Sequence, residues 1–242
     1  MPWDFALILL FLATGVPFLG RHRIRQLMRM PETTKAERLA LYRSTVAFQG
    51  VAAAVVFWRL HAHRVPLPAL GLAIANPPIV LTTSLLLSGL VLANQLVSLR
   101  RLGREPTERQ ALVQELALKI FPRDPSERLA FFGVVLTVSV CEEFIFRGFA
   151  QHVLEDVSGG VVLVGILGSA ALFAVAHLYQ GRRGLIATFV VGVLFAAVRT
   201  WTGSLLAPVA AHFAADLTAG FLAPSRCARA QASVNGNKVP HA

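Results

Sequence analysis

Three ionisable residues fall within one long apolar run of the chain. Glu142, Glu143 and Arg147 interrupt a run that begins at Leu129 and is otherwise suited to lipid. An ionisable residue in a membrane span costs roughly 2.5–3.5 kcal/mol on insertion scales, so each needs a partner or a function. Glu143 and Arg147 are four residues apart and share a helix face, where they can form an ion pair. Glu142 lies about 100° away and is the charge that this pairing leaves unexplained.

Two later apolar runs also carry polar side chains. His177 lies in the first of them, and His212 lies in the second with Asp216. The last two are four residues apart, and a carboxylate beside an imidazole fixes its tautomer and raises its basicity. Phe173, four residues before His177, is expected to line the same pocket. A lone histidine in a span is as often a packing residue as a ligand.

Taken together, these polar residues are better explained by one shared cavity than by four separate packing solutions. Burial can bring the pKa of Glu and His side chains near 7, where they transfer protons. The residues predicted to converge on a catalytic site are Glu142, His177, His212 and Asp216, with Glu143, Arg147 and Phe173 as supporting residues.

Two chemistries use such a set, and both activate water. In the first, Glu142 is the general base for water attack on an amide carbonyl, and imidazoles stabilise the oxyanion. In the second, a divalent ion of the zinc type acidifies the water. The ligands of that ion would come from the same four residues, namely His177, His212, Asp216 and Glu142. The residue pattern leaves both open.

The composition identifies the surroundings of these residues as a membrane. Of the 242 residues, 55% are apolar and 15% are charged, and the mean hydropathy is +0.60. These values lie outside the usual range of soluble domains and predict an all-α, polytopic transmembrane bundle. The net charge of +10 does not indicate a nucleic-acid partner, because the basic residues lie between the apolar runs.

A span needs about 20 apolar helical residues, and this criterion predicts about seven spans. Their approximate ranges are 3–20, 44–58, 77–99, 125–153, 160–178, 184–198 and 204–222. Asp124 followed by Pro125 is typical of a helix start and opens the fourth span. With these boundaries, Glu142 and His177 differ in depth by about 15 Å. A shared site then needs a tilted helix, a broken helix or a different span start.

Alternate connections between the spans differ in Lys and Arg content. One set, together with the C-terminal tail, carries 19 of these residues and the other set carries 3. The positive-inside rule then predicts an N-terminus outside and a C-terminus in the cytoplasm. We expect an integral protein of a bacterial inner membrane.

The motifs resemble those of the CAAX-protease and bacteriocin-processing (CPBP, or Abi) family of membrane proteins. Glu142 to Gly148 is similar to the EExxxR motif of the family, Phe173 to His177 to its FxxxH motif, and His212 to Asp216 to its HxxxN/D motif, in the expected order. The resemblance covers residues 125 to 222. Any one motif is weak, but the ordered set is specific.

The resemblance implies an all-helical intramembrane peptidase that cuts a membrane-embedded or membrane-associated peptide. It assigns water activation to Glu142, with His177 and His212 completing the site. Many relatives have Asn at the position of Asp216. A carboxylate there must be protonated, ligate a metal or orient His212. The alternatives are a non-catalytic scaffold or immunity protein of the same fold and, less favoured, a proton-coupled transporter.

The chain is predicted to divide into three parts. Residues 1–124 hold three spans, 125–222 form the four-span peptidase core, and 223–242 are a polar, disordered tail. Between the third and fourth spans, Leu112, Leu116 and Ile120 form an apolar stripe. This stripe is typical of an interfacial helix or of a loop helix packed on the bundle.

Overall fold

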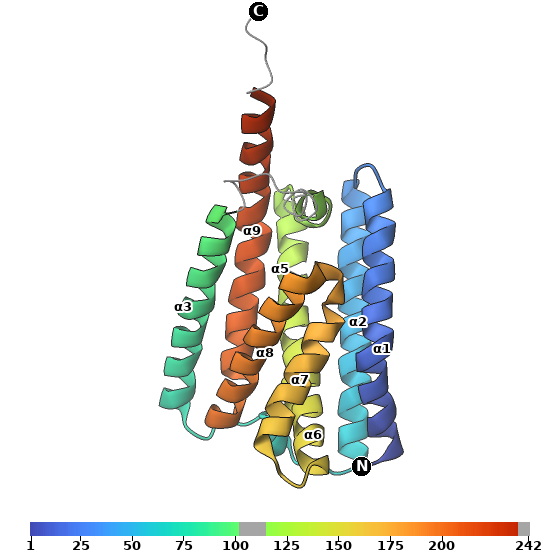
Figure 1. The fold of residues 1–242 in the computed structure, drawn as a ribbon, viewed down its shortest axis with the longest axis vertical. Coiled ribbons are helices and arrows are strands. Elements are labelled where there is room, and N and C mark those ends of the chain that lie inside the picture. The colour runs from blue at the N-terminus through green and yellow to red at the C-terminus, as the bar shows by residue number, and fades with distance from the viewer. Residues whose placement is uncertain (102–114, 237–242) are drawn as a thin grey trace, which may run out of the picture.

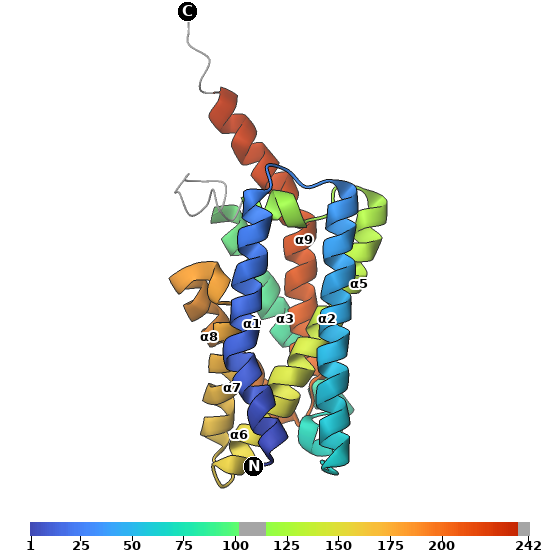
Figure 2. The ribbon, with the colours of Figure 1, turned by 90° about the vertical axis from the view of Figure 1, so that its right-hand side faces the viewer.

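Long helices make up the described part of the chain (Figures 1 and 2). The computed structural model describes residues 1–101 and 115–236, and the side chains of 99, 101 and 223–236 fall outside this description. The elements are α1 (Trp3–Arg29), α2 (Lys35–Ala62), the 3₁₀ turn η1 (Leu67–Leu70), α3 (Pro77–Arg101), α5 (Pro125–Glu143), the π-helical segment η2 (Phe144–Ala150), α6 (Gln151–Val157), α7 (Val162–Ala176), the 3₁₀ turn η3 (Leu178–Gln180), α8 (Gly181–Thr202) and α9 (Leu206–Gly236).

The predicted all-α membrane bundle is confirmed, whereas the count of seven spans is not. Five helical stretches of the described residues are long and apolar enough to cross a membrane, and they lie within 3–29, 35–62, 77–98, 125–157 and 178–202. Two further apolar helices, Val162–Ala176 and Leu206–Leu222, are shorter. Helix α9 continues to Gly236, through most of the predicted tail, and residues 237–242 lie outside the described residues.

The central element is a continuous helical rod, Pro125–Val157, made of α5, η2 and α6. Half of its most apolar window is buried in the protein, against 11–22% in the other four spans. The rod starts as predicted, because Asp124 caps the helix by accepting from the Glu127 N–H at 3.0 Å. Hydrogen bonds from Ser126 and from the Glu127 backbone, with the Lys35 ammonium, hold the pKa of Asp124 below its usual range.

The length of this rod changes the basis of the predicted difference in depth between Glu142 and His177. At about 1.5 Å per residue the rod is about 50 Å long, well above a hydrocarbon core of about 30 Å. Glu142 lies 15 residues before the end of α6, and His177 lies 15 residues after the start of α7. A short turn with Gly159 and Gly160 at positive φ joins the two helices. Counted from this turn, Glu142 and His177 are therefore equally far along the chain.

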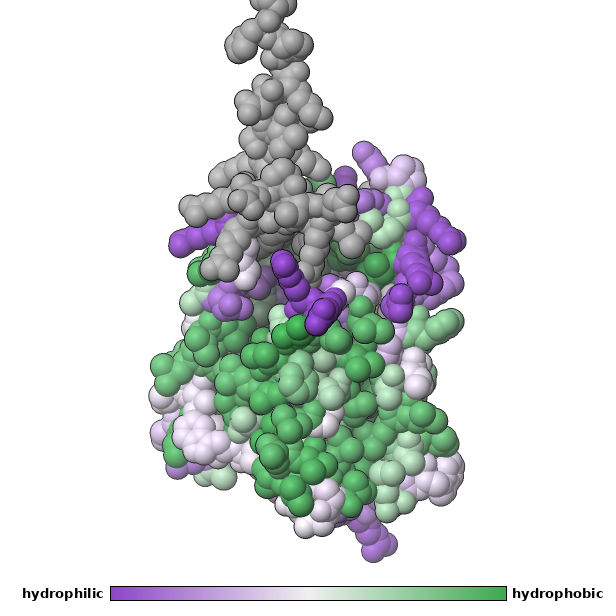
Figure 3. All heavy atoms as spheres, in the orientation of Figure 1, coloured by the Kyte–Doolittle hydropathy of each residue, from purple (hydrophilic) through white to green (hydrophobic). Residues whose placement is uncertain are grey.

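The helix α7 ends inside the bundle. It has 15 residues, and the chain turns back at η3 into α8. Figures 1 and 2 show this α7–α8 turn well below the level of the α1–α2 connection. Figure 3 shows apolar residues over most of the lower part of one face and hydrophilic residues near the α1–α2 connection. The end of α7 can therefore present His177 at mid-depth.

The helices α2 and α5 run side by side and in the same direction, as Figure 1 shows. Near their starts, the Arg38 guanidinium donates to the Glu127 carboxylate at 2.7 and 3.0 Å, and both side chains are buried. One turn further along, the rings of Tyr42 and Phe131 lie 5.6 Å apart. Because Arg38 also donates to the Thr33 carbonyl, the α1–α2 connection is tied to the same ion pair.

The predicted stripe before the fourth span is only partly described. Leu112 lies outside the described residues, while residues 115–120 are helical. On the side expected to be polar, Lys119 is buried, and its ammonium donates to the Leu27 and Met28 carbonyls. This segment therefore packs on the end of α1.

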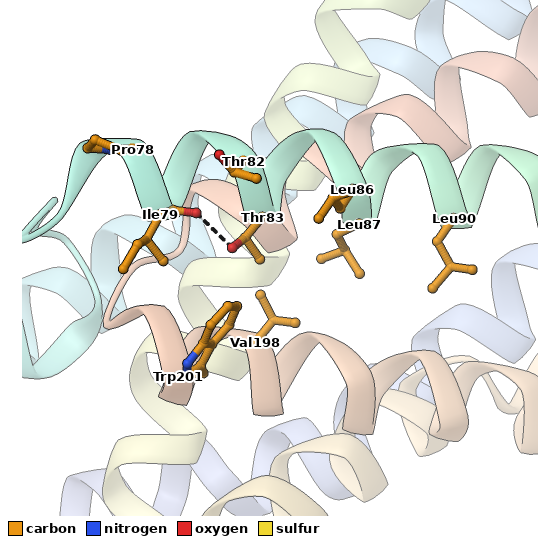
Figure 4. Close-up of a pocket in the computed structure, with 9 residues that line it drawn as sticks. All are labelled: Pro78, Ile79, Thr82, Thr83, Leu86, Leu87, Leu90, Val198 and Trp201. Atoms are coloured by element: carbon orange, nitrogen blue, oxygen red, sulfur yellow. Dashed lines mark hydrogen bonds between the residues drawn. The ribbon is translucent and has the colours of Figure 1, made fainter.

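An apolar groove of about 510 Å³ lies between α3 and α8. Figure 4 shows it between Thr82, Leu86 and Leu90 of α3 and Val198 and Trp201 of α8. None of the residues predicted to do chemistry lines it. Its apolar walls suit lipid chains in a bilayer.

We expect Arg38→Met to lower the free energy of unfolding by about 3–5 kcal/mol, because it leaves the Glu127 carboxylate buried without its partner. Thermal unfolding of the detergent-solubilised protein measures this. The control is Lys35→Met, because the Lys35–Asp124 pair is exposed, with side chains 51% and 36% accessible. Its loss costs about 0–1 kcal/mol. Equal effects of the two variants would contradict a special role for the buried Arg38–Glu127 ion pair.

Candidate active site

The site begins with a buried ion pair at the junction of α5 and η2. The Arg147 guanidinium donates to Glu143 Oε1 at 3.0 Å, and both side chains are fully buried. The predicted pair is therefore present. The guanidinium carbon also lies 4.1 Å from the ring centroid of Phe173 and 5.5 Å from that of Phe195, which are cation–π distances. The pair thus connects the rod to α7 and α8.

The segment that carries Arg147 is a π-helix, and all seven of its residues are buried. Single π-helical turns inside α-helices are uncommon and recur at functional sites. Here the turn starts directly after Glu142 and Glu143. The apolar run predicts a continuous α-helical span, and nothing in it indicates this π-helical segment.

His212 of α9 contacts the pair directly. Its Nδ1 donates to Glu143 Oε1 at 2.9 Å, and the side chain is buried. Its Nε2 lies 3.5 Å from Asp216 Oδ2 and 4.0 Å from Glu142 Oε2. Both ring nitrogens therefore face carboxylates, which accept hydrogen bonds but cannot donate them when ionised. Glu143 is thus more than the structural partner of Arg147.

The Glu142 carboxylate has two different surroundings. Its Oε1 accepts a hydrogen bond of 2.7 Å from the side-chain amide of Gln49. Its Oε2 is buried and has no hydrogen-bond partner, and it lies 4.0 Å from His212 Nε2. An unpaired buried carboxylate oxygen is costly. A separation of 4.0 Å from an imidazole nitrogen is too long for a direct hydrogen bond.

His177 lies at the C-terminal end of α7, where it caps the helix. Its Nδ1 donates to the Phe173 carbonyl at 2.9 Å. In a neutral imidazole this leaves Nε2 as the acceptor. The Phe173 ring lies between both histidines, with ring centroids 4.6 Å from His177 and 6.1 Å from His212. The Phe173 ring therefore links the two predicted histidines.

Asp216 lies at the rim of the site, and 44% of its side chain is exposed. The other carboxylates are enclosed, with side-chain exposures of 14% for Glu142 and none for Glu143. Asp216 is therefore the most exposed of the three carboxylates.

Two contributors to the site were not predicted. Gln49 lies in α2, far from the motifs, and a polar amide within an apolar span was its only signal in the sequence. Gly192 of α8 gives room to the ion pair, because a Cβ there would lie 3.4 Å from Arg147 Nη2 and 3.1 Å from the Cα and Cβ of Ala170. Small residues in spans usually allow close helix packing.

The arrangement of the same residues bears on the metal alternative. Among the side chains that the structure describes, no group of three or more from His, Cys, Asp or Glu is arranged to hold a metal ion. One reason is visible at His212, whose Nδ1 is engaged by Glu143 and whose Nε2 is 3.5–4.0 Å from the two remaining carboxylates. Zinc ligands lie at about 2.0–2.2 Å from the ion, so these side chains would have to move.

Comparison with known proteins identifies the same part of the chain. Residues 124–218 match the model of a protein family described as type II CAAX prenyl endopeptidase Rce1-like. The match begins at the cap of the central rod and includes Glu142, His177, His212 and Asp216. The predicted resemblance is confirmed over these residues. No curated protein and no solved structure matches the chain significantly.

We expect Gly192→Ala to lower the free energy of unfolding by about 1–3 kcal/mol, because the new methyl group would crowd Ala170 and Arg147 in a packed contact. The measurement is thermal unfolding in detergent. Gly89→Ala in α3 is the matched control, because nothing lies within 4 Å of its Cβ position. There the change is expected to be neutral or to stabilise α3 by about 0.5–1 kcal/mol. Similar losses of stability in both variants would show that the close packing around Gly192 does not depend on its missing side chain.

Proposed function

We propose, because residues 124–218 match the Rce1-like family of type II CAAX prenyl endopeptidases, that this protein is an intramembrane endopeptidase. It hydrolyses a peptide bond by water attack, with Glu142 as the general base. The observation that carries this proposal is the buried, unpartnered Oε2 of Glu142, which faces His212 Nε2 at 4.0 Å. A water molecule between them would give both groups a hydrogen-bond partner.

The first step of the proposed reaction is the activation of water. Glu142 Oε2 takes a proton from water as its oxygen attacks the carbonyl carbon of the scissile amide. His177 presents the lone pair of Nε2, which orients the water when the ring is neutral. The imidazole of His212 donates to the oxyanion that forms. Glu142 then returns the proton to the amide nitrogen as the carbon–nitrogen bond breaks.

The remaining residues hold this arrangement in place. Glu143 Oε1 accepts hydrogen bonds from His212 Nδ1 and from Arg147. The first of these bonds fixes the imidazole ring of α9 against the central rod. Asp216 lies 3.5 Å from His212 Nε2. This position favours an orienting role for Asp216, because an ionised carboxylate would repel an oxyanion. Phe173 packs against both imidazole rings.

The substrate in this proposal is a membrane-embedded or membrane-associated peptide. The central rod is about 50 Å long and Glu142 lies near its middle, so the scissile bond must reach the interior of the bilayer or its edge. The α1–α2 connection and the end of α9 lie at one end of the bundle, opposite the N-terminus (Figure 1). With the N-terminus and the end of α9 at opposite ends, and with the basic connections favouring the inside, we place the C-terminus in the cytoplasm and the N-terminus outside, in a bacterial inner membrane.

We expect Glu142→Gln and Glu142→Ala to lower kcat for peptide cleavage by about 10²–10⁴-fold, the usual contribution of a positioned base. Cleavage is followed with a peptide that ends in Cys, two aliphatic residues and one further residue with a free carboxylate, offered with and without a prenyl group. A single-span peptide is offered as a second substrate. Asp156→Asn is the control, because Asp156 is exposed at the end of α6. It should leave cleavage unchanged.

The outcome of that experiment separates the alternatives. Full cleavage by both Glu142 variants would reject the mechanism. A scaffold or immunity protein would cut none of the peptides and would tolerate the change. A proton-coupled transporter would also cut none, but it would lose flux in the Glu142 variants.

The metal alternative has its own test. Because the described donor side chains are not arranged around a common point, we expect cleavage to persist after dialysis against a strong chelator, with metal content measured on the same sample. Loss of cleavage that is restored by Zn²⁺ would contradict this expectation. In that case His177, His212, Asp216 and Glu142 would be the ligands, and the ion would acidify the attacking water.

A further inference from the structure

Gln49 contacts the candidate base from outside the part of the chain that matches the family. It lies in α2, and its side-chain Nε2 donates to Glu142 Oε1 at 2.7 Å. The two residues are 93 positions apart in the sequence. The matched residues begin at 124, so this contact belongs to none of the motifs that identify the site.

The position of Gln49 is fixed by the packing of α2 on the rod. The ion pair of Arg38 with Glu127 holds the two helices at one end. Beyond Gln49, the rings of Phe57 and Phe144 lie 6.3 Å apart. Contacts on both sides of Gln49 therefore set the register of α2 along α5, and the amide reaches Glu142 from a packed helix.

The hydrogen bond gives the two carboxylate oxygens different roles. Oε1 is occupied by the amide, while Oε2 is left buried and unpartnered on the side of His212. A carboxylate that is held through one oxygen loses its freedom to rotate about its last side-chain bond. An amide is also neutral, so it holds the carboxylate without neutralising its charge. A lysine at this position would neutralise it.

We propose that Gln49 is a positioning residue, which holds Glu142 through Oε1 so that Oε2 faces the water and His212. This role rests on the proposed peptidase function. It also makes α2 a part of the active site, although α2 lies outside the residues that match the family. A general base must be held within hydrogen-bond reach of the proton that it takes.

Two variants of similar shape test this role by kinetics. Gln49→Met removes the amide, and Gln49→Glu keeps the shape of the side chain but cannot donate when ionised. We expect both to lower kcat by about 10-fold or more, as misplacing a reacting group does, while KM stays within about 2-fold. A residue that only fills space would tolerate both.

The matched control is Gln151→Met. Gln151 is also a buried glutamine, but its amide donates to Thr200 Oγ1 at 2.7 Å and to the Ala196 carbonyl at 3.3 Å, in the contact of α6 with α8. Its loss should lower the thermal midpoint and leave kcat and KM of the folded protein unchanged. A fall in kcat that is equal in Gln151→Met and Gln49→Met would overturn the proposed role.

A thermal double-mutant cycle tests the contact without any substrate. Gln49→Met should lower the midpoint of unfolding by several degrees in the wild-type protein and by much less in the Glu142→Ala background. Additive shifts would overturn the contact itself. Coupled shifts with an unchanged kcat would overturn the positioning role.

The kinetic and the thermal experiments together also separate this inference from the function on which it rests. A wild-type protein that cuts none of the peptides would reject the peptidase function and the positioning role with it. Coupled shifts together with the loss of kcat in both Gln49 variants would support the inference.

Discussion

The arrangement of this protein depends on a single buried carboxylate, that of Glu143. Its Oε1 accepts from Arg147 at 3.0 Å and from His212 Nδ1 at 2.9 Å. A charge without a partner in this environment would cost several kcal/mol, so both contacts must persist in the folded state. Because Arg147 also lies against Phe173 and Phe195, the same carboxylate connects the central rod, α7, α8 and α9. The helices that supply the candidate catalytic residues are therefore fixed relative to one another by the charge beside them.

This constraint also accounts for the charge balance at the site. Three carboxylates, those of Glu142, Glu143 and Asp216, surround one guanidinium and one imidazole. Arg147 faces Glu143, and His212 lies between all three acids at 2.9 to 4.0 Å. A proton on His212 reduces the net negative charge and lets both ring nitrogens donate. An imidazole with both nitrogens facing carboxylates is placed to donate hydrogen bonds, so Glu142 is the better candidate for the base.

The sequence predicted those parts of the site that depend on local spacing. A separation of four residues on a helix places Glu143 beside Arg147 and His212 beside Asp216, whatever the rest of the fold does. The depth of Glu142 relative to His177 could not be predicted. The predicted span boundaries assume helices that match the hydrocarbon core, whereas the rod is longer than that core. The π-helical segment after Glu143 has only seven residues, which is too short to leave a periodic pattern in the sequence. The contact of Gln49 with Glu142 was missed because hydrophobic periodicity indicates which face of a helix is buried but not which helix covers it.

The contacts of α2 change how the parts of the chain are related. The family match and the motifs both lie after residue 124, so the first helices look like an addition to a complete peptidase core. Yet the rod that carries Glu142 is flanked along its length by α2, from the Arg38–Glu127 ion pair to the Phe57–Phe144 contact. One apolar cluster also joins Phe5, Val56 and Leu60 to Phe144 and Phe149 across the same boundary. If α2 moved away, Glu142 Oε1 would lose its only donor among the described hydrogen bonds, and the ion pair at the start of the rod would open. The geometry of the candidate base is therefore a property of the whole bundle, and the matched residues alone do not contain it.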